Sequence, residues 1–331
     1  MDVPCVRVER SAGEETRQAL AEADCLTDEF EIGHDDGWLY IPVSNPDAVP
    51  DDFEVVEWDA SPRRTQTTPA DILGYEPSLE RLGDIVIIDE DDDERAQEIA
   101  DAVLASDLPV STVVNRASEI KGELRVRDWD VLATERDEAP TETVHREYGC
   151  EFALDIAHVY FSPRLATERN RIVEQVTVGE HVFDMFAGVG PFAIPAAKRG
   201  AQVVAVDLNE HAVEYCRENA ERNRAADRVT VLQGDVREVS ADYEGWADRI
   251  VMNLPHSANE FVETAVALAG DDCVIHLYDI QHESDPFGPG EAAIRAAAEP
   301  EYDVSVENRQ VVRSYAPHEY NVCLDVRLTR R

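Results

Sequence analysis

The chain is poor in positive charge, and above all in lysine. Only two of its 331 residues are lysines, and 30 basic residues stand against 70 acidic ones, for a formal net charge of −40. The acidic residues are spread through amphipathic segments, which argues against a disordered acidic tail. At multimolar salt the Debye length falls to about 3 Å or less, so like charges barely repel. The composition therefore predicts a protein from a halophilic organism, and net charge does not exclude a nucleic acid as its partner.

Further absences narrow the class of protein. The six cysteines stand singly, without a Cys-x-x-Cys pair, which argues against zinc and iron–sulfur sites and against a disulfide framework. We find no secretory signal pattern and no apolar run long enough to cross a membrane. We therefore expect a cytoplasmic protein that requires no metal. Apolar residues make up 44% of the chain, which suffices for packed cores.

Length and local composition divide the chain into three predicted parts. We expect residues 1–68 to form a small α/β module that ends in the polar linker 61–70. Residues 69–164 are expected to form a second small α/β module, and residues 165–331 a larger domain. The expected state is a three-domain monomer.

Strand and helix patterns alternate from residue 165 onward, as a doubly wound sheet requires. The last two predicted strands, 302–313 and 319–329, follow each other without a helix and predict an antiparallel hairpin. That ending is typical of class I methyltransferases and not of dinucleotide dehydrogenases. We therefore predict an α/β, Rossmann-like domain with a seven-stranded sheet. The other predicted strands cover 181–186, 202–206, 228–232, 248–252 and 273–279.

A glycine turn follows the first of these strands, in the sequence V-F-D-M-F-A-G-V-G-P-F from residue 182. Asp184 ends the strand, Gly188 and Gly190 let the backbone approach a ligand, and the next helix offers free N–H groups. Asp207 ends the second strand, where an acidic residue binds ribose hydroxyls in nucleotide-binding sheets. Taken alone, such a turn serves NAD, FAD and S-adenosylmethionine alike, and some such turns bind nothing.

Two more signals lie at the ends of later strands. Asp235 stands where adenine-contacting residues sit in methyltransferases, although a helix N-cap explains it equally well. Asn253, Leu254 and Pro255 end the fourth strand, at the sheet edge where ligands bind in open α/β folds. This turn resembles the Asn/Asp-Pro-Pro-aromatic motif of enzymes that methylate nitrogen in bases. Together the signals favour S-adenosylmethionine as the cofactor.

Five segments together resemble the archaeal and eukaryotic type of tRNA (guanine-37-N1) methyltransferase. The resemblance covers the whole chain and implies a class I methyltransferase domain preceded by two smaller tRNA-contacting domains. It also implies S-adenosylmethionine as the cofactor and tRNA with guanine at position 37 as the substrate. The segments are V-H-R-E-Y-G (144–149), Y-F-S-P-R-L-A-T-E-R (160–169), D-M-F-A-G-V-G-P-F (184–192), V-D-L-N (206–209) and M-N-L-P-H-S-A-N-E-F (252–261).

The resemblance implies roles for single residues. Glu168 is the expected general base for the N1 proton, and Arg146 the expected cation opposite the guanine O6. Asn253 is expected to hold the exocyclic amino edge, and Pro255 to shape the pocket. Residues expected to contact the substrate are Tyr160 and Arg164. Residues expected to bind the cofactor are Arg169, Asp184, Phe186, Gly188, Gly190, Asp207, Leu208, Asp235, Val236 and Asn253.

Other activities remain open on the same sequence. The aminocarboxypropyl transferase of the wybutosine pathway shares the fold and the cofactor, but replaces F-S-P-R-L by something closer to F-S-x-G-N. Pro163 and Arg164 are intact here, which favours methyl transfer. The further alternatives are methylation of a wyosine precursor, an NAD-dependent oxidoreductase and a protein that binds without catalysis.

Overall fold

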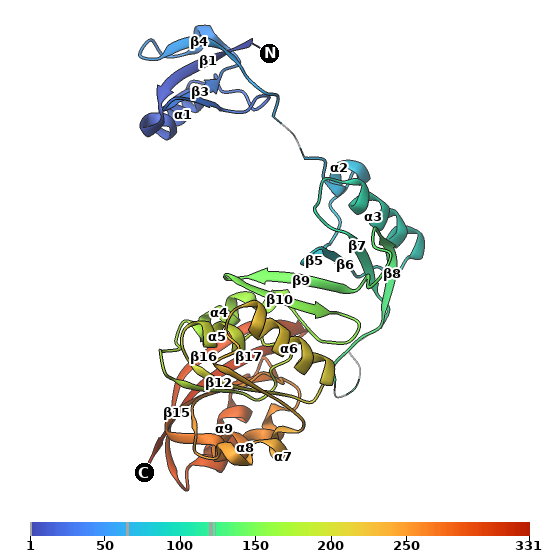
Figure 1. Ribbon diagram of the computed structural model, residues 1–331, viewed down its shortest axis with the longest axis vertical. Helices are drawn as coiled ribbons and strands as arrows, with labels where there is room; N and C mark the ends of the chain where they lie inside the picture. Colours follow the sequence, from blue (N-terminus) through green and yellow to red (C-terminus); the bar gives the residue numbers. More distant parts are fainter. Residues whose placement is uncertain (1, 64–65, 119–121, 123) are drawn as a thin grey trace. The chain divides into compact units, whose positions relative to one another are not determined.

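The fold divides between Thr67 and Thr68 into two units (Figure 1). The computed structural model describes residues 2–63, 66–118, 122 and 124–331, so Arg64 and Thr65 of the predicted linker lie outside the described residues. Among the described residues, no helix combines the length and the apolar character that a membrane span requires.

The first unit is a four-stranded antiparallel sheet with one helix. Its strands run in the order β2-β3-β1-β4. Leu20 of the helix packs on Val6 and Ile41 of the sheet, because these apolar residues recur with the periods of a helix and a strand. The predicted strands at Cys5 and Trp38 and the predicted helix are present. The elements are β1 (Asp2–Glu9), α1 (Gly13–Glu22), β2 (Gly33–Asp35), β3 (Trp38–Pro42) and β4 (Glu54–Asp59).

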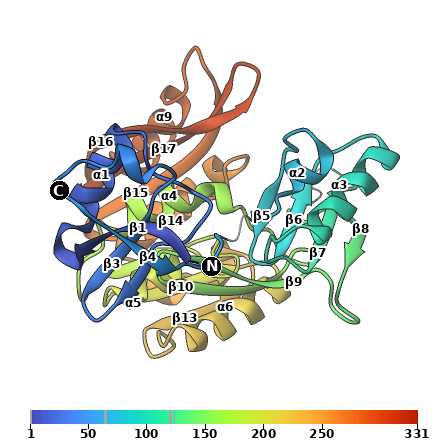
Figure 2. The same ribbon diagram turned by 90° about the horizontal axis from the view of Figure 1, so that it is seen from above.

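The second unit begins with another four-stranded sheet, in the order β5-β6-β7-β8. Helix α3 lies against this sheet (Figure 2) and buries Ile99 and Val103 on Val86 and Val113. It begins after Asp92, whose carboxylate accepts the N–H of Arg95 at 2.9 Å. The elements are α2 (Pro69–Leu73), β5 (Glu80–Leu82), β6 (Ile85–Ile88), α3 (Asp93–Ala105), β7 (Thr112–Arg116) and β8 (Trp129–Thr134).

A hairpin of β9 (Glu142–Glu147) and β10 (Cys150–Asp155) follows. Its buried Phe152 and Leu154 share one hydrophobic cluster with Ile85 of β6 and with side chains of the large sheet's helices. The hairpin therefore joins the smaller sheet to the larger one through a continuous core.

The larger sheet has seven strands in the order β13-β12-β11-β14-β15-β17-β16. The strands β11 to β15 are parallel to one another, and β17 is antiparallel to both of its neighbours. The predicted fold class is confirmed, including the terminal hairpin. The strands are β11 (His181–Asp184), β12 (Gln202–Asp207), β13 (Val229–Gln233), β14 (Ala247–Met252), β15 (Ala269–His282), β16 (Tyr302–Ala316) and β17 (Glu319–Arg330).

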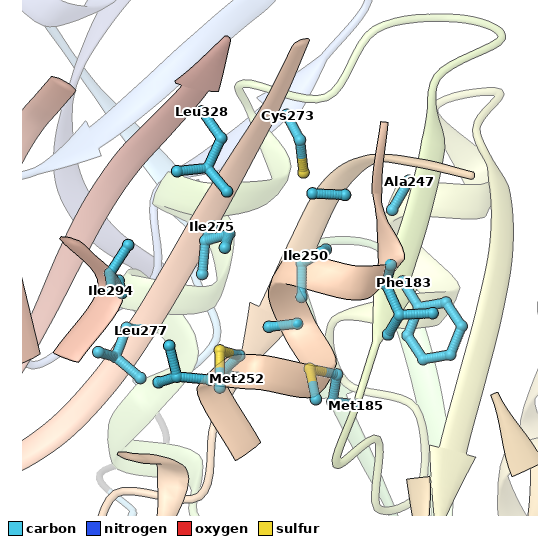
Figure 3. Close-up of a cluster of buried hydrophobic side chains, with 14 of the residues drawn as sticks. Phe183, Met185, Ala247, Ile250, Met252, Cys273, Ile275, Leu277, Ile294 and Leu328 are labelled. Atoms are coloured by element: carbon cyan, nitrogen blue, oxygen red, sulfur yellow. The ribbon is translucent and has the colours of Figure 1, made fainter. Parts of the chain in front are cut away.

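Helices cover both faces of this sheet, because successive side chains of a strand point to opposite faces. Phe183 packs with α8 and α9, whereas the preceding Val182 packs with α5. Figure 3 shows the first of these cores, where Phe183, Ile250, Ile275 and Leu328 come from four strands. The helices are α4 (Ala166–Val173), α5 (Ala193–Lys198), α6 (Glu210–Arg222), α7 (Val236–Val239), α8 (Val262–Leu268) and α9 (Gly288–Ala298).

The terminal hairpin reaches the edge at which the parallel strands end. Since β17 is antiparallel to both β15 and β16, β16 runs parallel to β15. The end of β16 and the start of β17 therefore extend the carboxyl edge of the sheet, beside the turns that carry the predicted motifs.

Candidate active site

One cavity of about 600 Å³ lies at the carboxyl edge of the seven-stranded sheet. The turns after β11, β12, β13 and β14 all contribute to its wall, because parallel strands end at the same edge. Most of the predicted site residues line it: Tyr160, Arg169, Phe186, Gly188, Asp207, Leu208, Asp235, Val236, Asn253 and Pro255.

Asp207 fixes the glycine turn as well as facing the cavity. Its carboxylate accepts the N–H of Gly188 at 2.7 Å and that of Asn209 at 2.9 Å. Gly188 has a φ of +53°, a left-handed conformation that glycine adopts without strain. Burial raises the pKa of Asp207, against the effect of these N–H groups. The remaining lone pairs of the carboxylate can accept hydrogen bonds from a ribose.

A pair of aromatic rings also lines the cavity. Phe186 and Phe261 meet edge to face at 5.0 Å, and the guanidinium of Arg237 lies 4.6 Å from the centre of the Phe261 ring. Asp235 caps α7 through the N–H of Arg237 at 2.9 Å and also pairs with its guanidinium, which lowers the pKa of the carboxyl. Together with Val236, the two rings give this part of the cavity an apolar wall.

Arg169 is anchored in the wall of the cavity. It forms two hydrogen bonds with Glu147, at 2.7 and 2.6 Å, and donates to the carbonyl of Ser162 at 3.0 Å. Its guanidinium stacks on Phe161 at 4.9 Å. These contacts hold the guanidinium of Arg169 in place, and Tyr160 lines the same cavity.

Known proteins resemble the chain over its full length. The model of the TRM5/TYW2 methyltransferase domain matches residues 143–306. The tRNA (guanine(37)-N(1))-methyltransferase Trm5b of Pyrococcus abyssi is 39% identical, with 98% of each chain covered. The chain belongs to the TRM5/TYW2 methyltransferase family.

Other comparisons agree with this family. The tRNA methyltransferase 5 N-terminal domain matches residues 5–50, and the TYW2 N-terminal domain matches residues 67–137. The structure of aTrm5 in complex with tRNALeu is 32% identical and has a TM-score of 0.73, with 98% of this chain and 99% of the other covered. The tRNA(Phe) (4-demethylwyosine(37)-C(7)) aminocarboxypropyltransferase of Pyrococcus horikoshii is 34% identical over 68% of this chain and 80% of its own.

Two predicted cofactor residues of this TRM5/TYW2 methyltransferase lie behind the cavity wall. Gly190 has a φ of +89°, and a Cβ there would approach Ile194 Cδ1 to 2.7 Å and Cys216 Sγ to 3.0 Å, so it permits close helix packing. Asp184 is fully buried under the turn, and neither carboxylate oxygen has a hydrogen-bond partner of ordinary geometry among the described residues. Burial, with a smaller contribution from Asp207, raises the pKa of Asp184 from 3.8 to about 7.

This shift predicts a pH dependence of stability. Between pH 4 and 7 the folded state keeps a proton on Asp184 that the unfolded state releases, so the free energy of unfolding falls as pH rises. Without cofactor, Asp184→Asn should abolish a fall of up to about 4 kcal/mol, measured by denaturant unfolding across this range. Asp235→Asn should leave the slope between pH 4 and 7 unchanged, because the pKa of Asp235 is lowered in the folded state and its contribution to stability changes only below about pH 4. Parallel pH profiles of wild type and Asp184→Asn would contradict the assignment.

The structure does not bring three further predicted residues to the cavity. Arg146 is 75% exposed and pairs with Glu151 at 2.9 Å, on the other face of β9 from His145 and Glu147. Strand alternation explains this position, because neighbouring residues of a strand point to opposite faces. Arg164 is 54% exposed and pairs with Glu80 at 2.7 Å, which ties it to β5.

Glu168 is the third such residue, and it is buried behind the wall. Its carboxylate pairs with Arg171 at 2.7 and 2.8 Å and accepts the hydroxyl of Tyr278 at 3.0 Å. The Tyr278 ring packs 5.9 Å from that of Phe192, which lines the cavity. Glu168 is thus next to the cavity but held by an ion pair.

One buried cluster brings together three potential metal ligands. Atoms of His276, Cys323 and Asp325 lie within 4.8 Å of one another. However, Arg249 contacts His276 Nε2 at 2.7 Å, and Arg171 contacts Asp325 at 2.5 Å. Two guanidinium groups at this distance would repel a cation, so the cluster is better described as a buried ion-pair network.

Several residues that line the cavity were assigned no role from the sequence. Phe261 ends the segment that resembles the family motif, and its aromatic character could have suggested a role. The residues of the terminal hairpin belong to no recognisable motif, because only the strand register brings them to the site. The cavity residues that sequence analysis did not single out include Arg125, Asn209, Arg237, His256, Phe261, Ile280, Arg313, Tyr315 and Asn321.

Proposed function

We propose that this protein transfers a methyl group from S-adenosylmethionine to N1 of guanine at position 37 of tRNA. The observation that supports it most is the shared cavity. Asp207 and Asp235, on the cofactor side, and the Asn253-Leu254-Pro255 turn, on the acceptor side, line the same space. The full-length likeness to Trm5b of Pyrococcus abyssi supports the same reaction.

The described residues fit this cofactor. Asp207 would bind the ribose hydroxyls, and the apolar wall that contains Phe186 and Phe261 would pack against the adenine. Leu208 and Val236 add apolar contacts to the same wall. When bound, S-adenosylmethionine supplies an electrophilic methyl group on a positively charged sulfur.

On the acceptor side, a proton must leave the guanine before or as the new bond forms. The N1–H proton would pass to Glu168, the bond between N1 and the methyl carbon would form, and the carbon–sulfur bond would break. For this, the Glu168 carboxylate must turn from Arg171 toward the cavity when tRNA binds. Arg171 would keep its ion pair with Asp325 at 2.5 Å, so that it remains neutralised. Asn253 would orient the base and Pro255 would hold the turn rigid.

We infer that residues 1–68 and 69–164 contact the tRNA and that residues 165–331 carry the methyl transfer. The matches of two N-terminal domain models to residues 5–50 and 67–137 support this division. We also infer a cytoplasmic monomer from a halophile. The net charge of −40 supports the halophilic origin.

Product analysis tests the reaction. The protein is incubated in multimolar KCl with S-adenosylmethionine and a tRNA transcript that carries G37. The tRNA is then digested to nucleosides, whose masses are measured by mass spectrometry. We expect 1-methylguanosine from this transcript and no product from a matched A37 transcript. An aminocarboxypropyl adduct would support the sister activity instead, and cofactor binding without any product would support a non-catalytic protein.

A further inference from the structure

Two arginines of the cavity have no acidic partner among the described residues. Arg169 and Arg237 also line the cavity, but they pair with Glu147 and Asp235. Arg125 and Arg313 form no ion pair with any carboxylate in the described part of the chain, although the sequence contains 70 acidic residues. The Nε of each is buried without a hydrogen-bond partner among these residues. A ligand that accepts a hydrogen bond would satisfy these donors, because a buried N–H without a partner is destabilising.

Arg313 stands opposite an equally unpaired acceptor. It is the cross-strand partner of Asn321, whose side chain is 2% exposed and whose Oδ1 has no partner within the described residues. Directly opposed residues of antiparallel strands share a face. Ile280 is the partner of Asn321 on the other side, and all three line the cavity. The hairpin thus presents the donor Arg313 and the acceptor Asn321 side by side, and with Ile280 they form one row across the three strands.

This row lies on the acceptor side of the cavity. The N–H of Ile280 donates to the carbonyl of Pro255 at 3.1 Å, which connects the row to the Asn253-Leu254-Pro255 turn. In the sheet, β16 lies five strand positions from β12, which ends in Asp207. At about 4.8 Å per strand this corresponds to roughly 24 Å of sheet. The row is therefore remote from the ribose site.

We propose that Arg313 and Asn321 recognise the Watson–Crick edge of the target guanine. Arg313 donates to O6, and Asn321 accepts one N–H of the exocyclic amino group, whose second N–H stays available to Asn253, so that N1 lies between these contacts and faces the methyl donor. A phosphate would satisfy only Arg313, because it offers no donor to Asn321. Arg313 also supplies the positive charge near O6 that Arg146, on the outer face of β9, does not. This inference rests on the proposed reaction.

Inosine at position 37 provides the decisive substrate, since it lacks the exocyclic amino group of guanine. We expect the wild type to favour G37 over I37, and Asn321→Leu to lower kcat/KM for G37 about 5–10-fold while barely affecting I37. The different N1 acidity of the two bases cancels when variants are compared. Arg313→Gln should lower kcat about 10–100-fold on both substrates. The dissociation constant of S-adenosylmethionine should stay unchanged in both variants.

Arg309→Gln is the matched control, because Arg309 lies on the same strand but pairs with the half-buried Glu291 at 2.6 Å. It should behave as wild type. Weaker S-adenosylmethionine binding in either variant would assign the pair to the cofactor's amino-acid end and overturn the proposal. An equal fall in kcat/KM on the G37 and I37 substrates in Asn321→Leu would also overturn the proposal. A wild type that methylates both substrates equally well would do the same. If the wild type methylates G37 and both variants match it, only this inference fails, whereas an inactive wild type refutes the proposed reaction itself.

Discussion

Replacing Glu168 with Gln is expected to lower kcat for tRNA methylation by about 10²–10⁴-fold, the range typical of a lost general base. Gln has nearly the same shape but cannot accept the N1 proton. The hydrogen bond from Tyr278 and the ion pair between Arg171 and Asp325 can both persist in the variant, so the site should stay folded. Single-turnover methylation at saturating tRNA and S-adenosylmethionine measures the effect.

Glu174→Gln provides the control for this experiment. Glu174 follows the same helix and accepts a hydrogen bond only from Asn170, at 2.8 Å, among the contacts described for its side chain. We expect it to turn over at the wild-type rate. The dissociation constant of S-adenosylmethionine should be the same in wild type and in both variants. Normal turnover of Glu168→Gln would exclude the base role and leave the residue as a structural partner of Arg171.

Asp325→Asn is expected to lower the free energy of unfolding by about 3–5 kcal/mol, the usual cost of breaking a buried ion pair. Asp325 is 3% exposed and accepts hydrogen bonds from His276 at 2.7 Å and Arg171 at 2.5 Å. Although burial alone would raise the pKa of this carboxyl, these bonds hold it well below its ordinary value. The variant would leave the charge of Arg171 only partly compensated.

Denaturant unfolding at constant high salt measures this loss. Asp272→Asn is the control, because Asp272 pairs with Arg327 at 2.7 Å but its side chain is 62% exposed. Exposed pairs contribute about 0–1 kcal/mol, and less at high salt. A loss below about 1 kcal/mol for Asp325→Asn would show that the network around His276 contributes little to stability.

The sequence was sufficient to predict the fold class of the catalytic domain. Apolar runs alternate with helical patterns from residue 165 onward, and they predict the five parallel strands and the final hairpin that the sheet contains. Because such strands end at one edge, the sequence also indicated that Asp207, Asp235 and Asn253 would meet. All three line the same cavity.

The positions of Arg146 and Glu168 depend on contacts that sequence does not encode locally. The alternation along β9 predicts that His145 and Arg146 face opposite ways, but not which of them faces inward. The packing of the β9–β10 hairpin decides that, and Arg146 lies outside. Glu168 is held by Tyr278, which lies 110 residues further along the chain.

The amino-acid sequence by itself determined the fold class, the cofactor edge of the sheet and the family of enzymes that the chain resembles. These follow from local periodicity and from short motifs, in which neighbouring residues act together. Only the tertiary structure decided which charges face the cavity, because burial and strand register depend on distant segments. The pairing of Arg313 with Asn321 is the clearest case, since it arises from the register of β16 on β17 and from no motif. Although acidic residues greatly outnumber basic ones, Arg313 has no carboxylate partner in the described part of the chain.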